Sequence, residues 1–356
     1  MEAKLQPLQT GMGLQPAKFA LFGRTHYYQV PPAPKGTMVF LPGCARAATG
    51  FWPPSPQAPE CTGFPEDVSH AIQALMAGYA LLVPTPQNPN LCFSASDGDF
   101  EKLIPIIERF WALTGLKAKP LFMGGASAGG SVAVRFPAFA KGKLKIDGML
   151  LEVSTNQSPL SGGKPVPDYP PTVWVCMERD AESQREAKEH AAGLTRAKVG
   201  AAVVVSPARK VTDTYFSDRM VSVTAAQSKK VVQGLRAISL VDAAGNLKSN
   251  PKDNMAAWMK QLKPHLPAGQ PFTLGTVRKS PLFQALAVAY AGHEHVADYT
   301  TAAIKFFEAD GQADMKALVA RHAVPVPTKL CGCCPPWTVC GCVLEPNRPS
   351  LPFCPV

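Results

Sequence analysis

The 356-residue chain has few charged residues and no long apolar run. Charged residues make up 17% of the sequence, below the usual share of about 25%. Because hydrophobic residues reach 46%, the low charge indicates a globular core and excludes a largely disordered chain. No apolar run reaches the ~18 residues of a membrane-spanning helix, so we expect no transmembrane segment. The N-terminus also lacks the apolar core of a signal peptide, which favours a cytoplasmic location.

A continuous basic stripe is missing as well, although the formal net charge is +10. The lysines and arginines are scattered, and the densest run is only Lys141, Lys143 and Lys145, without interleaved aromatic residues. This pattern is typical of a solvated basic surface, and we expect no nucleic-acid partner. The sequence contains no internal repeats, and its length allows one large core with an insertion.

Short apolar runs alternate with amphipathic segments between residues 26 and 206. The apolar runs predict strands that are buried on both faces, and the amphipathic segments predict helices. This alternation predicts an α/β fold with a mostly parallel central sheet flanked by helices. The predicted strands cover residues 27–30, 37–41, 79–83, 120–123, 146–153, 172–177 and 201–205, and the predicted helices cover residues 66–76, 99–113, 127–137 and 181–197.

The remaining segments do not show this alternation of apolar runs and amphipathic segments. Residues 1–25 show no clear periodicity and are interpreted as an N-terminal arm. Residues 207–280 contain two predicted helices, 224–235 and 254–262, and no strand of core quality, so we interpret them as an insertion. The core is then formed by residues 26–206 and 281–323, with helices predicted at 282–291 and 296–308. Residues 324–356 form a tail rich in proline and cysteine.

Ser127 lies in the motif Gly125-Ala126-Ser127-Ala128-Gly129, directly after a predicted strand and before a predicted helix. A strand that reverses sharply into a helix needs small neighbours, because larger side chains would collide there. The turn places the serine oxygen at a helix N-terminus, where backbone N–H groups favour a developing negative charge. The motif therefore predicts a nucleophilic serine. The alternatives are a glycine-rich turn with a structural serine, and a phosphate-binding loop, which the missing Walker lysine disfavours.

With this motif the chain resembles the α/β-hydrolase superfamily, over about residues 25–206 and 281–310. The segment from Leu41 to Cys44, with Phe51-Trp52, is similar to the loop after the third strand in that superfamily, which supplies the oxyanion hole. The resemblance implies that the backbone N–H groups of Cys44 and Ala128 bind the oxyanion, although Pro42 stands where histidine is common. Residues 41–52 and 61–66 are also similar to uncharacterised plant and algal members.

A serine nucleophile needs a base, and the base needs an orienting acid. In this fold the acid follows the serine in the chain, and the histidine follows the acid. Asp180, after the predicted strand 172–177, is the favoured acid, with Glu178 as the alternate and with an N-cap role for Asp180 also open. His293 is the favoured base, because Gly292-His293 resembles the catalytic histidine loop of the superfamily, and His295 is the alternate. Two histidines and one glutamate in this spacing do not form a metal-ligand set.

The insertion separates the last predicted core strand from this histidine loop. It would therefore emerge over the site, where a lid or cap belongs. Its apolar residues either line a substrate pocket or only pack the insertion onto the core. These residues include Met255, Trp258, Met259 and Leu262.

The ten cysteines are unevenly distributed. Cys44 and Cys61 flank one loop and form a candidate disulfide, whereas Cys92 and Cys176 are expected to be buried as small hydrophobic residues. The crowded tail is compatible with disulfides, with a soft metal site or with S-acylation. Because disulfides persist in oxidising compartments, the tail leaves secretion open. Its clustered cysteines are Cys331, Cys333, Cys334, Cys340 and Cys342.

We therefore predict a serine hydrolase that cleaves a small-molecule carboxylic ester or other acyl substrate through an acyl-enzyme. This chemistry needs no cofactor and no metal. Amides, thioesters and peptides remain open as substrates. One alternative is a non-catalytic binding protein with the hydrolase fold, and another is a metal-binding or interaction module in the cysteine-rich tail.

Overall fold

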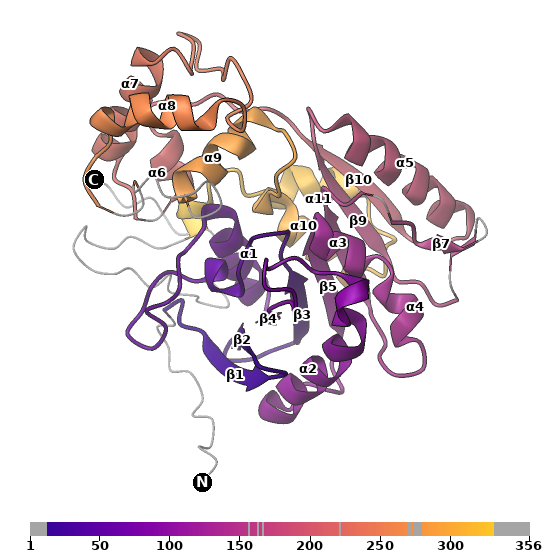
Figure 1. Cartoon of the computed structure of the whole chain (residues 1–356). Helices are drawn as coiled ribbons and strands as arrows, with labels where there is room; N and C mark the ends of the chain where they lie inside the picture. The colour runs from indigo at the N-terminus through magenta and orange to yellow at the C-terminus, as the bar shows by residue number, and fades with distance from the viewer. Residues whose placement is uncertain are drawn as a thin grey trace.

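The computed structural model describes residues 13–330, except 156, 162–163, 166, 221, 270–271 and 273–279. Its centre is an eight-stranded sheet with the strand order β1-β2-β4-β3-β5-β6-β9-β10 (Figure 1). The β1–β2 and β2–β4 pairs are antiparallel, and the other neighbours are parallel. The strands are β1 (Ala17–Leu21), β2 (Arg24–Gln29), β3 (Gly36–Leu41), β4 (Tyr79–Val83), β5 (Leu121–Ala126), β6 (Gly148–Glu152), β9 (Thr172–Met177) and β10 (Ala201–Ser206), and a small separate hairpin joins β7 (Leu160–Ser161) to β8 (Lys164–Pro165).

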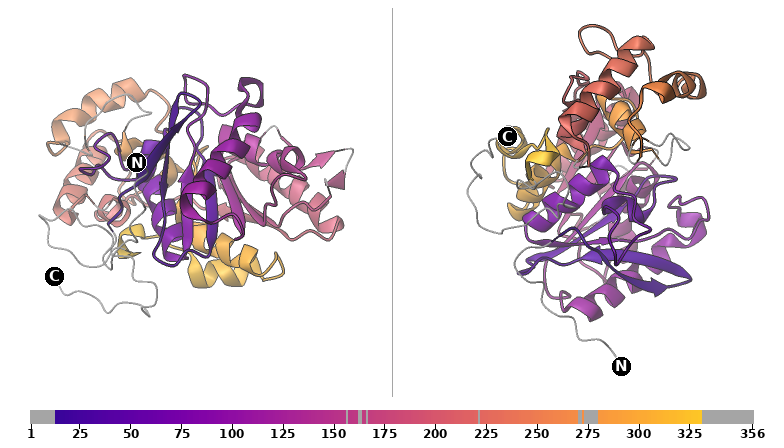
Figure 2. Two further views of the ribbon diagram at one scale, coloured as in Figure 1. Left: turned by 90° about the horizontal axis from the view of Figure 1, so that it is seen from below. Right: turned by 90° about the vertical axis from the view of Figure 1, so that its left-hand side faces the viewer.

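Helices cover both faces of the sheet (Figure 2). Along β3, Met38 and Phe40 point to one face and Val39 and Leu41 to the other, and all four are fully buried. Because both faces of such a strand are buried, its sequence is a continuous apolar run. The mostly parallel α/β sheet predicted from the sequence is confirmed, and its strand order is that of the α/β-hydrolase fold. Helices α1 (Pro65–Met76), α10 (Thr300–Glu308) and α11 (Met315–His322) pack on the first face, and α2 (Asp99–Thr114), α3 (Ala128–Ala133), α4 (Phe136–Ala140) and α5 (Ala181–Arg196) pack on the second.

Two predicted segments differ from the structure. The arm predicted for residues 1–25 contains β1, an edge strand whose side chains are exposed or only partly buried. The β1 sequence lacks the apolar pattern of a buried strand, because its side chains are largely exposed. The helix predicted for residues 127–137 is two helices, since α3 ends at Ala133 and Pro137 lies in the first turn of α4. Proline has no N–H to donate and suits the start of a helix, not its interior.

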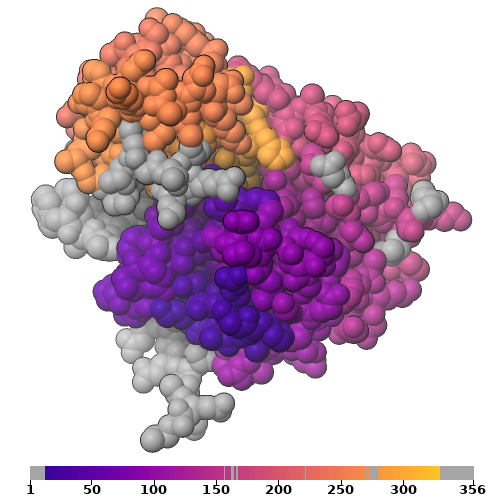
Figure 3. Space-filling view, in the orientation of Figure 1, coloured from indigo at the N-terminus to yellow at the C-terminus, as the bar shows by residue number. Residues whose placement is uncertain are grey.

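Residues of the 207–280 segment and α9 (Pro281–Tyr290) share a third hydrophobic core, apart from the two cores on the faces of the sheet. It appears as a lobe on the sheet domain (Figure 3). Trp258 stacks on Phe283 of α9 with ring centroids 6.4 Å apart, and Leu262 is fully buried. These apolar residues, with Met255 and Met259 beside them, pack the lobe together. The helices of the insertion are α6 (Tyr215–Arg219), α7 (Ala225–Ala237) and α8 (Met255–Leu262).

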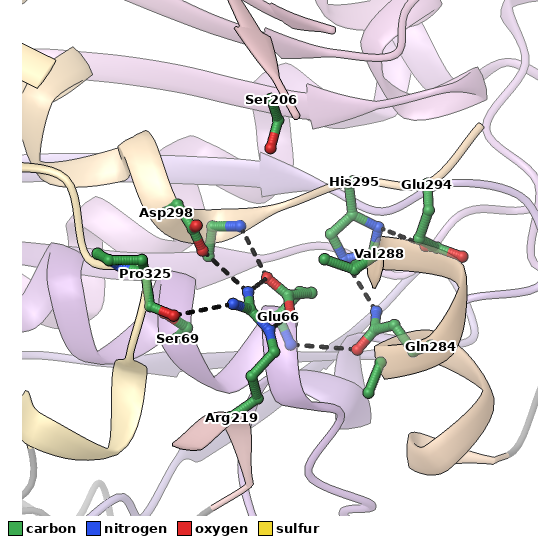
Figure 4. Close-up of polar contacts among 12 residues, drawn as sticks. Glu66, Ser69, Ser206, Arg219, Gln284, Val288, Glu294, His295, Asp298 and Pro325 are labelled. Carbon is green, nitrogen blue, oxygen red and sulfur yellow. Dashed lines mark hydrogen bonds and ion pairs between the residues drawn. The ribbon is translucent and has the colours of Figure 1, made fainter. Parts of the chain in front are cut away.

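A buried ionic network joins the lobe to the sheet domain (Figure 4). Arg219 of α6 makes two hydrogen bonds to Glu66 of α1, at 2.8 and 2.7 Å, and a third to Asp298 at 2.9 Å. Arg209 donates to the other oxygen of Asp298 at 2.8 Å. Because Arg219 is only 3% exposed, these hydrogen bonds replace its hydration.

The disulfide expected between Cys44 and Cys61 is wrong, because Cys44 pairs with Cys92. These two cysteines follow the adjacent parallel strands β3 and β4, and the Ala45 N–H donates to the Leu91 carbonyl between their loops at 2.9 Å. Cys92 is thus a disulfide partner and not a free buried thiol. Cys61 and Cys176 are free and buried, as expected for Cys176. Burial raises the pKa of both free thiols to about 12.

The part of the chain that the structure describes has no helix both long and apolar enough to cross a bilayer. The predicted cysteine cluster of residues 331–342 lies outside the described residues, as do residues 1–12 of the predicted arm. The predictions for these segments stay predictions.

Candidate active site

Ser127 occupies the sharp turn between β5 and α3, with φ 49° and ψ −117°. A positive φ is costly for a residue with a side chain, and surrounding contacts must hold it in place. The glycines of the motif allow this turn. A Cβ on Gly125 would lie 2.7 Å from the Gly129 backbone, and a Cβ on Gly129 would collide with the carbonyl oxygen of Leu41. The loop after β3 therefore packs directly on the first turn of α3.

Three of the predicted site residues form a continuous row of hydrogen bonds. The Ser127 hydroxyl lies 3.0 Å from His293 Nε2, and His293 Nδ1 lies 2.7 Å from Asp180 Oδ2. Because the Asp180 carboxylate accepts the proton on Nδ1, Nε2 is left as an acceptor for the serine hydroxyl. The His293 side chain is 42% exposed, whereas that of Asp180 is 9% exposed. Ser127 and His293 are 166 positions apart in the chain, and His293 and Asp180 are 113 positions apart.

Asp180 also caps α5, as the alternative interpretation of the sequence expected. Its carboxylate accepts from the Ser183 N–H at 3.3 Å and from the Ser183 hydroxyl at 2.6 Å. Burial raises the pKa of Asp180, but the hydrogen bonds from His293 and Ser183 outweigh burial and hold it below its usual value. Asp180 therefore stays ionised and faces Nδ1 of His293 with a full negative charge. Ser183 was not singled out in the sequence, although its position three residues after the N-cap was a signal for it.

The His293 loop begins where α9 ends. Ala291 adopts the left-handed conformation, with φ 58°, and its carbonyl accepts the Arg179 N–H at 2.8 Å. The Arg179 guanidinium lies 4.3 Å from the centre of the Tyr290 ring. From the insertion, Lys252 Nζ donates to the His293 carbonyl at 2.6 Å. Contacts from the Asp180 loop and from the insertion therefore both fix the backbone beside the imidazole.

Neither alternate residue is hydrogen-bonded to Ser127 within the described part of the chain. His295 lines the same cavity as Ser127, but it is 4% exposed and its ring bonds to Glu294 at 3.1 Å (Figure 4) and to Asp67 at 2.9 Å. Burial lowers the pKa of His295, but these two carboxylates outweigh it and raise the pKa well above the ordinary value. Glu178 accepts from the Ala208 N–H at 2.7 Å, so its carboxylate holds the segment after β10 and is not bonded to His293.

The residues whose N–H groups are predicted to bind the oxyanion both lie beside Ser127. Cys44 and Ser127 line one cavity together, and Ala128 and Ser127 line another. A Cβ on Gly43 would lie 3.5 Å from the Ser127 Cβ, which shows how closely the loop after β3 approaches the serine. No acceptor within the described residues is bonded to the N–H of Cys44 or Ala128. The disulfide to Cys92 anchors the Cys44 loop at its other side.

Two cavities of similar size open beside Ser127. One has a volume of about 460 Å³ and also contacts His293, Arg46 and Lys252. The other has a volume of about 470 Å³ and is lined by Phe93, Phe100 and several hydroxyl side chains. Sequence reasoning did not single out Arg46 or Lys252. Neither belongs to a motif, and only the folded chain brings them to the serine.

No protein family model and no curated protein sequence matches the chain. Solved structures do resemble it at low sequence identity. A predicted CIB-like hydrolase from Thermoplasma acidophilum is 15% identical, covers 55% of this chain and 88% of its own, and has a TM-score of 0.40. An esterase/lipase from an uncultured bacterium is 12% identical, with 56% and 76% coverage and a TM-score of 0.37. An arylesterase is 14% identical, with 58% and 77% coverage and a TM-score of 0.36. The similarity to plant and algal proteins stays a prediction, and these likenesses concern only the fold, which from its own strand order is the α/β-hydrolase fold.

Proposed function

We propose that the protein is a serine hydrolase that cleaves carboxylic esters of small molecules through an acyl-enzyme. The observation that carries this proposal is the row of hydrogen bonds from Ser127 through His293 to Asp180. A serine in this arrangement can lose its proton to the imidazole as its oxygen attacks a carbonyl carbon. The positive φ of Ser127 supports the same role, because strain of this kind is common at nucleophilic serines.

In the proposed reaction, the Ser127 oxygen forms a bond to the carbonyl carbon while His293 Nε2 takes the hydroxyl proton. The N–H groups of Cys44 and Ala128 stabilise the negative oxygen of the tetrahedral intermediate. His293 then gives its proton to the leaving alcohol oxygen as the ester bond breaks. Water, activated by the same imidazole, releases the acid from Ser127. Asp180 holds the tautomer and stabilises the imidazolium, and no cofactor or metal takes part.

Residues 207–280 act in this proposal as a fixed cap beside the site. Lys252 from the insertion and Phe283 from α9 line the cavity that also contacts Ser127 and His293. The buried ion pairs of Arg219 hold the cap against α1, which disfavours a freely moving lid. His295 and Glu178 have structural roles here, because both are fully engaged with other partners.

The proposal is tested by labelling with a fluorophosphonate, which reacts with activated serines. We expect the natural protein to be labelled and Ser127→Ala to lose the label while keeping its fold, as circular dichroism would show. A series of esters of increasing acyl length then identifies the preferred substrate. A folded natural protein that neither takes the label nor cleaves any ester would contradict the proposal and favour a non-catalytic binding protein.

A further inference from the structure

The two cavities beside Ser127 receive different halves of an ester. His293 must deliver its proton to the leaving oxygen, so the leaving group lies on the side of the imidazole. His293 lines only the cavity of about 460 Å³, as far as the described residues show. The acyl group then extends toward the cavity that Phe93 and Phe100 line. The chemistry of the first cavity therefore selects the alcohol or phenol part of the substrate.

Arg46 and Lys252 line this leaving-group cavity, together with His295, whose raised pKa keeps it charged. Arg46 is only 9% exposed and bonds through Nη2 to Glu294 at 3.2 Å. Its Nη1 is buried and has no hydrogen-bond partner among the described residues. A buried donor of a charged group without an acceptor is costly, so an acceptor from a ligand would stabilise it. Lys252 is exposed and holds its Nζ at the rim, on the His293 carbonyl.

Two carboxylates, Glu294 and Asp67, lie against these three cations, and Asp67 bonds to His295. Glu294 is the only acidic residue among the described residues that line the cavity. Burial raises the pKa of Glu294, but Arg46, His295 and Lys252 outweigh it and hold the pKa far below the usual value. Glu294 is thus already shared between Arg46 and His295. The charge of Lys252 and the Nη1 donor of Arg46 remain for a ligand.

We propose that this cavity binds a leaving group that carries a carboxylate, so that the preferred substrates are esters of hydroxy acids. The carboxylate accepts from Arg46 Nη1 and lies near Lys252 Nζ. The ester oxygen then lies near His293 Nε2. Charge-assisted hydrogen bonds of this kind are stronger than neutral ones and give specificity against an uncharged leaving group. This inference rests on the proposed hydrolase function.

The test compares release of acetate from para-acetoxybenzoate and from its methyl ester, which lacks the negative charge and carries one more methyl group. We expect kcat/KM of the natural protein to be at least about tenfold higher for the anion. Arg46→Gln should remove most of this preference, and Lys252→Met should lower it about threefold. Lys260→Met removes the same charge from the same insertion but does not line the cavity, so it should leave the ratio unchanged.

Arg46→Gln leaves the Glu294 carboxylate buried without its partner. If this single variant is unfolded, the double variant Arg46→Gln/Glu294→Gln takes its place, because it buries two neutral side chains and no unpaired charge. A ratio near one in the natural protein, with both esters cleaved, would overturn this inference and leave the hydrolase proposal intact. So would a high ratio that persists in Lys252→Met and in a folded Arg46 variant. Failure to cleave either ester by a protein that still takes the fluorophosphonate label at Ser127 would overturn this inference alone. Failure to cleave any ester together with absence of the label would overturn both proposals.

Discussion

At the scale of single residues, Asp180 has two roles that one substitution can separate. It caps α5 through Ser183 and bonds to His293 Nδ1. Asparagine is also a good N-cap, so Asp180→Asn removes the charge and largely preserves the cap. An asparagine amide can also donate to the imidazole, which favours the tautomer that cannot accept the proton of Ser127.

We therefore expect Asp180→Asn to lower kcat by about 10⁴ with little change in the urea unfolding midpoint. Steady-state ester hydrolysis and urea unfolding of the same preparations measure both quantities. Glu178→Gln is the matched control, because Glu178 lies two residues earlier and bonds to the Ala208 N–H. Equal losses of kcat in the two variants would show that the orienting acid was wrongly assigned.

The residues of this site differ in how far the sequence could predict them. Ser127 has a local signal, since its small neighbours are needed for the turn itself. Asp180 follows from chain order and His293 from the resemblance of its loop, and the structure joins both to Ser127 in one row of hydrogen bonds. Arg46 and Glu294 could not be found this way, because their bond spans 248 positions and follows no pattern.

At the scale of elements, the contact between α6 and α1 determines how firmly the cap is held. Arg219 is buried between Glu66 and Asp298, and the three side chains leave almost no surface to water. We expect Arg219→Met to cost about 3–5 kcal/mol in the free energy of unfolding, because it leaves buried carboxylates without compensation.

Urea unfolding checks this, with Arg236→Met as the control. Arg236 pairs with Asp213 on the surface of the same insertion, where both side chains are about two-fifths exposed. The loss of an exposed pair should cost about 0–1 kcal/mol. Similar losses in the two variants would mean that the buried network contributes no more than a surface pair.

The elements themselves were largely predictable where burial is strong. The strands at 79–83 and 172–177 have the predicted bounds. Continuous apolar runs between turn residues are typical of strands that are buried on both faces of a parallel sheet. The edge strand β1 and the pairing of Cys44 with Cys92 were missed for a common reason. Neither leaves a local pattern, because each depends on which segments the fold makes neighbours.

At the scale of the whole molecule, stability should depend on the charge of His295. Asp67 and Glu294 bond to this histidine, and the two carboxylates raise its pKa well above 6.5. A raised pKa stabilises the folded state below the ordinary pKa. This contribution is lost as the pH rises through the raised pKa.

We expect the free energy of unfolding to fall above about pH 6.5, with a slope from this group of at most about 1.4 kcal/mol per pH unit. Urea unfolding at a series of pH values measures the slope. His295→Gln should be less stable at neutral pH and should show a flatter dependence. A natural protein whose alkaline slope matches that of the variant would contradict a charged His295.

The hydrophobic core of the lobe has a consequence for how the site comes into being. Ser127 and Asp180 extend from the sheet, but His293 follows α9, whose apolar face belongs to the core of the insertion. Under the proposed function, a chain that has formed its sheet but not this lobe has a nucleophile and an acid without a base. Hydrolysis would then require the lobe as well as the sheet to be folded, so that catalysis itself reports the maturation of the protein.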